Sequence, residues 1–117
     1  MAEIVMFHNP RCSKSRGALE ILREGDLDVE VVEYLKAPPD RSTLEQIVDA
    51  VGEPPGALVR RDPLFSELGL TDGDVSSRDA VVTILLEHPE LMQRPVVLRG
   101  GRGVIARPSE RVAEVLE

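Results

Sequence analysis

The first 34 residues combine a strand, a helix and a second strand, and this order restricts the fold more than any other feature of the chain. Residues 3–7 are mostly apolar and predict a buried strand. Residues 13–25 repeat apolar side chains at helical spacing and end at a glycine, which is typical of a helix. Residues 29–34 are rich in β-branched side chains and predict a second strand. Because the crossover in such a unit is right-handed, we expect two neighbouring parallel strands.

The middle of the chain, from about residue 42 to residue 88, predicts helices throughout. Ser42-Thr43-Leu44-Glu45 matches a capping box, which would begin a helix that ends near Gly52. Further helical segments are predicted at residues 57–61, at 63–68, and from the cap at 76–79 to Leu86.

The last part of the chain predicts a hairpin and a final helix. Residues 95–98 and 104–106 are short apolar strands, and the glycine-rich turn between them favours antiparallel pairing. A helix is expected over 108–116. The complete order, strand–helix–strand, helical insertion, strand–strand–helix, is that of a thioredoxin-like fold. We therefore predict one α/β domain over residues 1–117, with a mixed four-stranded sheet and a helical insertion at about 40–90.

Composition excludes several classes of protein. The net charge of −7 and an aromatic content of 3% argue against nucleic-acid binding, which needs a basic face or stacking side chains. The longest apolar run, residues 81–86, is far too short to span a membrane, and the N-terminus lacks the pattern of a signal peptide. A single cysteine cannot form an intramolecular disulfide and suits a reducing compartment. We expect a cytoplasmic protein.

Cys12 is the candidate nucleophile. It lies where the first strand turns into the first helix, and a helix N-terminus offers unpaired N–H groups and partial positive charge that favour the thiolate. Arg11, Lys14 and Arg16 add cationic charge nearby. A lone cysteine is often only a small buried hydrophobe, but these polar neighbours argue against a core position. The two histidines lie far apart in sequence, so no metal site is predicted.

Five separated motifs carry a family resemblance. They are His8-Asn9-Pro10-x-Cys12-x-x-Ser15-Arg16, Tyr34-Leu35 with Pro38-Pro39, Ala57-Leu58-Val59-Arg60, His88-Pro89 with Arg94-Pro95-Val96-Val97, and Arg107-Pro108-Ser109-Glu110. In this order they resemble the glutaredoxin-coupled arsenate reductase family of thioredoxin-like proteins. The chain is most similar to a shorter sub-branch of that family, because it ends soon after the last motif.

The resemblance implies a function and a set of site residues. Cys12 would attack arsenate and reduce it to arsenite, with glutathione and glutaredoxin as external reductants and no bound cofactor or metal. His8 and Ser15 would support the cysteine, either electrostatically or by hydrogen bonding. The oxyanion would be held by Arg60, Arg94 and Arg107. The fold also places a cis-proline at the start of the third strand, where Arg94-Pro95 falls.

Two alternatives share the fold. A thiol oxidoreductase acting on glutathionylated or other thiol substrates would need Cys12 but would tolerate loss of Arg60 or Arg107. A regulator resembling the Spx transcription factors would bind RNA polymerase, although those proteins typically carry Cys-x-x-Cys, and here the motif is Cys12-x-x-Ser15. Each arginine also has a simpler interpretation, as a surface residue beside a strand or helix.

Overall fold

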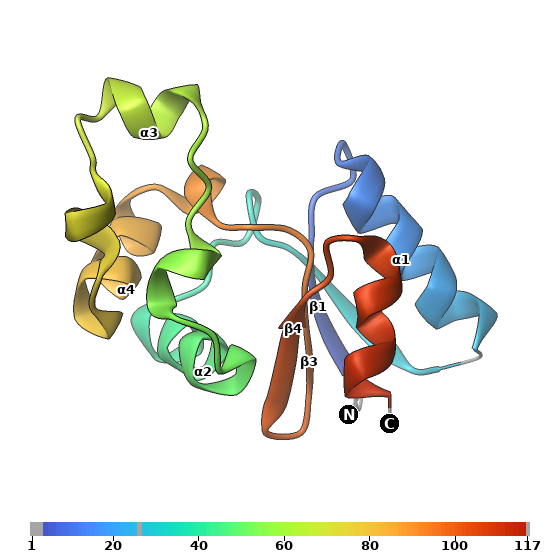
Figure 1. Ribbon diagram of the computed structural model, residues 1–117. Coiled ribbons are helices and arrows are strands. Elements are labelled where there is room, and N and C mark those ends of the chain that lie inside the picture. The colour runs from blue at the N-terminus through green and yellow to red at the C-terminus, as the bar shows by residue number, and fades with distance from the viewer. Residues whose placement is uncertain (1–3, 26, 117) are drawn as a thin grey trace.

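Four strands form one mixed sheet in the computed structural model, which describes residues 4–25 and 27–116 (Figure 1). The strands are β1 Ile4–His8, β2 Val29–Glu33, β3 Val96–Arg99 and β4 Arg102–Ile105. Their order in the sheet is β2-β1-β3-β4. The β1–β2 pair is parallel, and the β1–β3 and β3–β4 pairs are antiparallel. The parallel pair, the hairpin and the mixed four-stranded sheet predicted from the sequence are confirmed.

One face of the sheet is covered by the first and last helices. α1 Ser13–Glu24 and the 3-10 helix η4 Ser109–Val115 pack side by side there (Figure 1). Alternate residues of β1 point to this face, so Ile4 and Met6 are fully buried against Leu22 and Val112. Burying a side chain of this size stabilises the fold by roughly 1.5–3 kcal/mol. The packing fixes the end of the chain beside its first helix.

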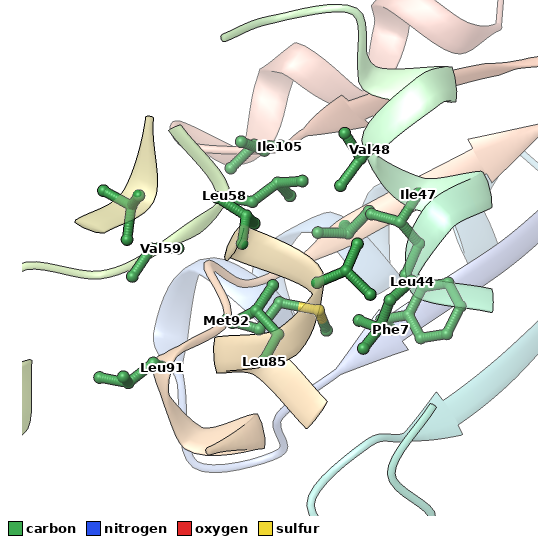
Figure 2. Close-up of a cluster of buried hydrophobic side chains, with 14 of the residues drawn as sticks. Phe7, Leu44, Ile47, Val48, Leu58, Val59, Leu85, Leu91, Met92 and Ile105 are labelled. Carbon is green, nitrogen blue, oxygen red and sulfur yellow. The ribbon is translucent and has the colours of Figure 1, made fainter. Parts of the chain in front are cut away.

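The opposite face is covered by the helices between β2 and β3. Phe7 of β1 points to this side and joins Leu44, Ile47 and Leu85 in a second buried cluster (Figure 2). The helices of this region are α2 Arg41–Val51, η1 Pro55–Leu58, α3 Pro63–Glu67, η2 Asp72–Val75, α4 Arg78–Glu87 and η3 Pro89–Leu91. In Figure 1, α3 lies farther from the sheet than α2. The helical region thus has its own extensive core, which is anchored to the sheet.

The predicted start of α2 is wrong. Asp40, not Ser42, is the N-cap, and its Oδ1 accepts the N–H of Thr43 at 2.9 Å. The short carboxylate of aspartate reaches the third N–H of the helix as well as a serine hydroxyl does. The residues of the expected capping box therefore lie inside the first turn of the helix.

The helix predicted over 57–61 is also wrong. η1 begins earlier, at Pro55, whose fixed φ angle suits the first helical position. The chain is extended from Val59, which pairs with Met92 in an isolated antiparallel bridge. The N–H of Arg60 then donates to the carbonyl of Leu91 at 2.7 Å. The middle of the chain is therefore not helical throughout, and Arg60 follows a helix instead of lying within one.

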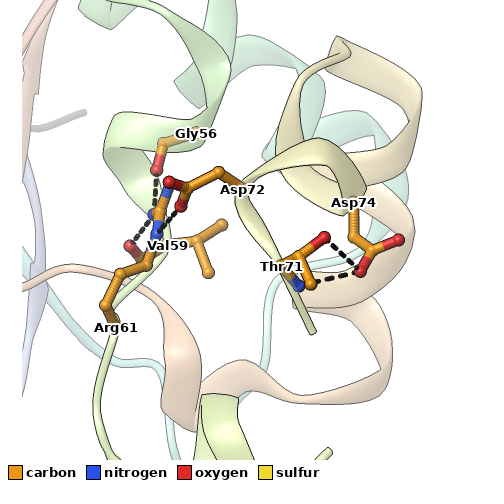
Figure 3. A network of polar contacts seen from close by, with 6 residues as sticks. All are labelled: Gly56, Val59, Arg61, Thr71, Asp72 and Asp74. Atoms are coloured by element: carbon orange, nitrogen blue, oxygen red, sulfur yellow. Dashed lines mark hydrogen bonds and ion pairs between the residues drawn. The ribbon is translucent and has the colours of Figure 1, made fainter. Parts of the chain in front are cut away.

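Arg61 holds this region together. Its Nη1 donates to the carbonyl oxygens of Gly56 and Val59, and its Nε lies 3.2 Å from Asp72 Oδ1 (Figure 3). Its guanidinium carbon lies 5.2 Å from the centre of the Phe65 ring. One arginine therefore joins η1, η2 and α3. This gives Arg61 a structural role that its neighbour Arg60 does not share.

The helices of the described ranges are short. The longest, α1, has 12 residues, whereas a membrane-spanning helix needs about 20 apolar residues. Within residues 4–25 and 27–116, no helix combines the length and the apolar character needed to span a bilayer.

Candidate active site

Cys12 lies in a tight turn between β1 and α1. Its N–H donates to the carbonyl of Asn9 at 3.0 Å, and the N–H of Arg11 donates to Asn9 Oδ1 at 2.9 Å. Cys12 is the N-cap residue of α1, with extended backbone and no side-chain capping bond. Its sulfur therefore lies at the end of the helix where the first N–H groups are unpaired. The thiol is partly exposed.

His8 and Ser15 are buried residues that hold this turn by hydrogen bonds. Ser15 is fully buried, and its Oγ accepts the N–H of Asn9 at 3.0 Å. The same oxygen lies 2.7 Å from Nδ1 of His8. Two bonds to one hydroxyl tie the end of β1 to the first turn of α1. The orientation of the Cys12 turn is thereby fixed.

His8 reaches the Cys12 turn through this hydrogen bond to Ser15. Burial lowers its pKa; Glu33 opposes this shift, and Arg23 and Arg16 add to it. Since the pKa falls from an ordinary value that is already below neutrality, the imidazole is neutral at pH 7. Of the two roles that the resemblance implied for His8, the structure favours hydrogen bonding to Ser15.

Arg94 and Arg107 approach Cys12 from the two outer ends of the β3–β4 hairpin. Each precedes a cis-proline, Pro95 or Pro108, so the predicted cis bond at Arg94-Pro95 is confirmed. Nη1 of Arg107 lies 3.7 Å from Cys12 Sγ and donates to the carbonyl of Arg94 at 2.9 Å. These segments lie more than 80 residues from Cys12 in the chain and meet it at the edge of the sheet.

The thiol of Cys12 is more acidic than an ordinary cysteine. Burial raises its pKa, but the backbone N–H of Ser15, the side chain of Arg94 and the N–H of Lys14 lower it by more, so the net shift is downward. Donors and cations stabilise the charged form. A larger fraction of the sulfur is therefore thiolate near neutral pH, and thiolate is the reactive form.

Arg60 is not brought to the thiol. Its Nη1 lies 3.1 Å from Oδ2 of Asp62, and both side chains are mostly buried. Its charge does act on Tyr34, where it opposes the rise in pKa that burial causes, so Arg60 lies on the same side of the molecule as the site. The predicted residues that the structure gathers around the loop are Cys12, His8, Ser15, Arg94 and Arg107.

Ser109, which the sequence analysis quoted in a motif without giving it a role, joins two helices beside the site. Its Oγ donates to the carbonyl of Lys14 at 2.7 Å, which ties the start of η4 to the first turn of α1. The helices approach closely at Gly17, where an added Cβ would lie 2.7 Å from Ser109 Oγ. Because Arg107 lies two residues before Ser109, the bond from Ser109 to Lys14 holds the Arg107 segment beside Cys12. In the sequence, the only sign of this close approach between the two helices was Gly17, a glycine inside a predicted helix.

The described residues offer no ready metal site. Within residues 4–25 and 27–116, no three side chains of histidine, cysteine, aspartate or glutamate gather into a set that could hold a metal ion. His88 lies in the helical region, with its Nδ1 3.6 Å from Glu90 Oε1, away from the Cys12 turn. The groups that converge at the site are a thiol and two guanidinium groups.

The strand order, the helices on both faces and the thiol at the end of β1 define a thioredoxin-like protein. The model of the family described as "ArsC family" matches residues 7–115, and the chain belongs to this family. It is 43% identical over 118 residues to an arsenate reductase of Neisseria meningitidis serogroup A, covering 99% of this chain and 100% of the relative. It is 35% identical over 117 residues to an arsenate reductase of Escherichia coli K12, covering 99% and 82%.

A solved structure supports the fold assignment. The arsenate reductase from Vibrio cholerae superposes with a TM-score of 0.87 at 34% identity, covering 97% of this chain and 98% of that one. The thioredoxin-like fold predicted from the sequence is therefore confirmed. So is the resemblance to the arsenate reductase family.

Proposed function

We propose that this protein reduces arsenate to arsenite through the Cys12 thiolate, with glutathione and glutaredoxin as external reductants. The observation that carries the proposal is the acidic thiol of Cys12 at the start of α1, with Nη1 of Arg107 3.7 Å from its sulfur. Guanidinium groups form charge-assisted and often bidentate hydrogen bonds to tetrahedral oxyanions. Membership of the ArsC family, with relatives named arsenate reductase, supports the same substrate.

The first step joins sulfur to arsenic. Arg94 and Arg107 bind the oxyanion beside Cys12, and Arg60 leaves Asp62 to complete the set. The thiolate then attacks arsenic, an S–As bond forms, and one oxygen leaves as hydroxide, which takes a proton to become water. Arsenic remains in its pentavalent state, now bound to Cys12. The guanidinium groups offset the negative charge that would otherwise repel the thiolate.

The second step reduces arsenic with an external thiol. The chain has one cysteine, so it cannot resolve the adduct by an internal disulfide. A glutathione thiolate attacks Cys12 Sγ, an S–S bond forms, and the S–As bond breaks with its electron pair moving to arsenic, which leaves as arsenite. Glutaredoxin then reduces the Cys12–glutathione disulfide by thiol exchange. Such a cycle suits the cytoplasm, where glutathione keeps thiols reduced.

Arsenate-dependent NADPH oxidation, coupled through glutathione, glutaredoxin and glutathione reductase, tests this function. We expect turnover by the unaltered protein, background rates for Cys12→Ser, and unchanged rates for the control Ser13→Ala, an exposed neighbour. Turnover that persists in Cys12→Ser would contradict the proposal. So would an unaltered protein without turnover whose thiol is shown to be reactive.

The position of Arg60 favours one alternative substrate class. Because Arg60 pairs with Asp62, only two of the three predicted arginines lie ready at the thiol. A thiol oxidoreductase would not need the third. Reduction of a glutathionylated peptide by the unaltered protein, with no arsenate turnover in the coupled assay, would favour this alternative.

A further inference from the structure

Tyr34 lies at the edge of the sheet that carries the candidate site. It directly follows β2, and β2 runs parallel to β1, with His8 paired to Glu33 in register. Carboxyl ends of parallel strands meet at one edge, where ligands of α/β proteins commonly bind. Tyr34 is the only tyrosine of the chain and is 0% exposed. Its ring belongs to the buried cluster on the α2 side.

The hydroxyl of Tyr34 is buried without a hydrogen-bond partner among the described residues. Nε of Arg94 is also buried without a hydrogen-bond partner among the described residues. An unpartnered buried hydroxyl destabilises the folded state, because it gives up its bonds to water and gains none. A phenylalanine would fill the same core position without this cost. The hydroxyl therefore needs an explanation other than packing.

The side chains of Arg94 and Asn9 act on this hydroxyl. Burial raises the pKa of Tyr34, whereas Arg94, the amide side chain of Asn9 and the charge of Arg60 act to lower it, and the net shift is upward. The phenol therefore keeps its proton at neutral pH. The guanidinium of Arg94 can only donate hydrogen bonds, and no acceptor among the described residues lies within hydrogen-bond distance of the hydroxyl. The proton of the hydroxyl requires an acceptor, and an oxyanion is rich in acceptors.

We propose that the Tyr34 hydroxyl donates a hydrogen bond to the oxyanion that Arg94 binds beside Cys12. Arg94 acts on both the Tyr34 hydroxyl and the Cys12 thiol, and the parallel register of β1 and β2 brings the segments of these two residues to the same end of the sheet. A neutral donor at this point adds directional recognition of an anion oxygen to the charge that the arginines supply. The identity of the anion as arsenate rests on the proposed function. The binding of an oxyanion by Tyr34 does not.

Protection of Cys12 from iodoacetamide by oxyanions tests this role without requiring turnover. The probes are arsenate, phosphate and sulfate, each titrated against the alkylation rate of the unaltered protein and of Tyr34→Phe. We expect the half-protecting concentration to rise roughly tenfold to a hundredfold in Tyr34→Phe, as for loss of one hydrogen bond to a charged group. The control Thr83→Val removes an exposed hydroxyl of α4 and should leave protection unchanged.

Two further readouts separate this role from a structural one. The pH dependence of alkylation should be the same in Tyr34→Phe and the unaltered protein, because Tyr34 is not among the groups that shift the Cys12 pKa. The melting temperature of Tyr34→Phe should be equal or higher, since the variant loses an unpartnered buried hydroxyl. Equal anion protection in the two proteins would overturn the inference. A lower melting temperature together with an altered alkylation profile would also overturn it, because Tyr34 would then act only by placing Arg94.

The inference and the proposed function can fail separately. Anion protection that depends on Tyr34, in a protein that does not turn over arsenate, would uphold the inference and overturn the proposed function. If the unaltered protein turns over arsenate but oxyanions do not protect its Cys12, the proposed function stands and the inference is overturned. The same holds if oxyanions protect Cys12 equally in the unaltered protein and in Tyr34→Phe.

Discussion

The arginines of the sheet and the arginine of the helical region are placed in different ways. Arg94 and Arg107 flank the β3–β4 hairpin, so the register of the sheet brings both to Cys12. Arg60 follows η1 in the helical region, and its guanidinium pairs with Asp62, two residues away. The two arginines fixed by the sheet are held beside Cys12 without a carboxylate partner among the described residues. A residue fixed by a local ion pair must first give up its partner.

The largest expected effect separates Arg94 from Arg60. Arg94→Ala should lower kcat/KM for arsenate by about 100-fold to 1,000-fold, the usual cost of removing one preorganised donor. Arg60→Ala should cost about tenfold, because part of its binding energy is spent on breaking the ion pair with Asp62. The coupled NADPH assay measures both, and circular dichroism checks that both variants are folded.

The same two variants should differ in the acidity of the thiol. Arg94 lowers the pKa of Cys12, so Arg94→Ala raises it, and less thiolate is present at neutral pH. The pH profile of iodoacetamide alkylation should therefore move to higher pH in Arg94→Ala and stay unchanged in Arg60→Ala. Equal activity losses and equal profiles would remove the distinction between the two kinds of arginine.

An intermediate effect should follow from closing the gap between α1 and η4. Gly17→Ala places a methyl group 2.7 Å from Ser109 Oγ, and overpacking of this kind costs roughly 1–3 kcal/mol. Alanine gains about 0.5–1 kcal/mol within a helix, so we expect a net loss of about 1 kcal/mol in urea unfolding, together with reduced activity because Arg107 moves.

A second substitution provides the control for this contact. In a double-mutant cycle, Ser109→Gly makes room for the methyl group, so the loss from Gly17→Ala should be smaller in that background than in the unaltered protein. Additive effects on the free energy of unfolding would show that the two helices do not meet as described.

The smallest expected effect comes from freeing Arg60. Asp62→Asn removes the charge that holds Arg60, while an asparagine keeps the N-cap bond of α3, in which Asp62 Oδ1 accepts the N–H of Phe65 at 3.2 Å. We expect the half-protecting concentration of sulfate in the alkylation assay to fall about threefold, in the range of a partly exposed ion pair. Asp72→Asn, which affects Arg61 instead, is the matched control and should cause no change. Weaker sulfate protection in Asp62→Asn would mean that Asp62 helps the anion site.

The features set by local sequence were predicted well. The strand–helix–strand order and the hairpin follow from side-chain periodicity and turn residues, and they suffice to place Cys12 at the start of α1. The Arg94 and Arg107 segments were chosen by motif, and the hairpin register explains why both reach Cys12. The roles of the site residues remain predictions.

The features that depend on competing partners could not be predicted. Asp40 and Ser42 are both good N-cap residues, and the choice between them depends on how the chain enters α2. The pairing of Arg60 with Asp62 depends on where η1 ends, and that end was misplaced. The bond from Ser109 to Lys14 joins residues 95 positions apart, which no local pattern reports.

The bond between Ser109 and Lys14 also links the candidate site to the 3-10 helix η4. η4 is a short 3-10 helix held by Val112 and Val115, and Arg107 lies just before it. Short 3-10 helices have poorer hydrogen-bond geometry and open more readily than the strands of a sheet. Each local opening of η4 would withdraw Arg107 and leave the sheet and the Cys12 turn intact. Molecules with η4 open would be folded but inactive. The activity would therefore depend on the equilibrium between the open and closed states of η4, and not on global unfolding.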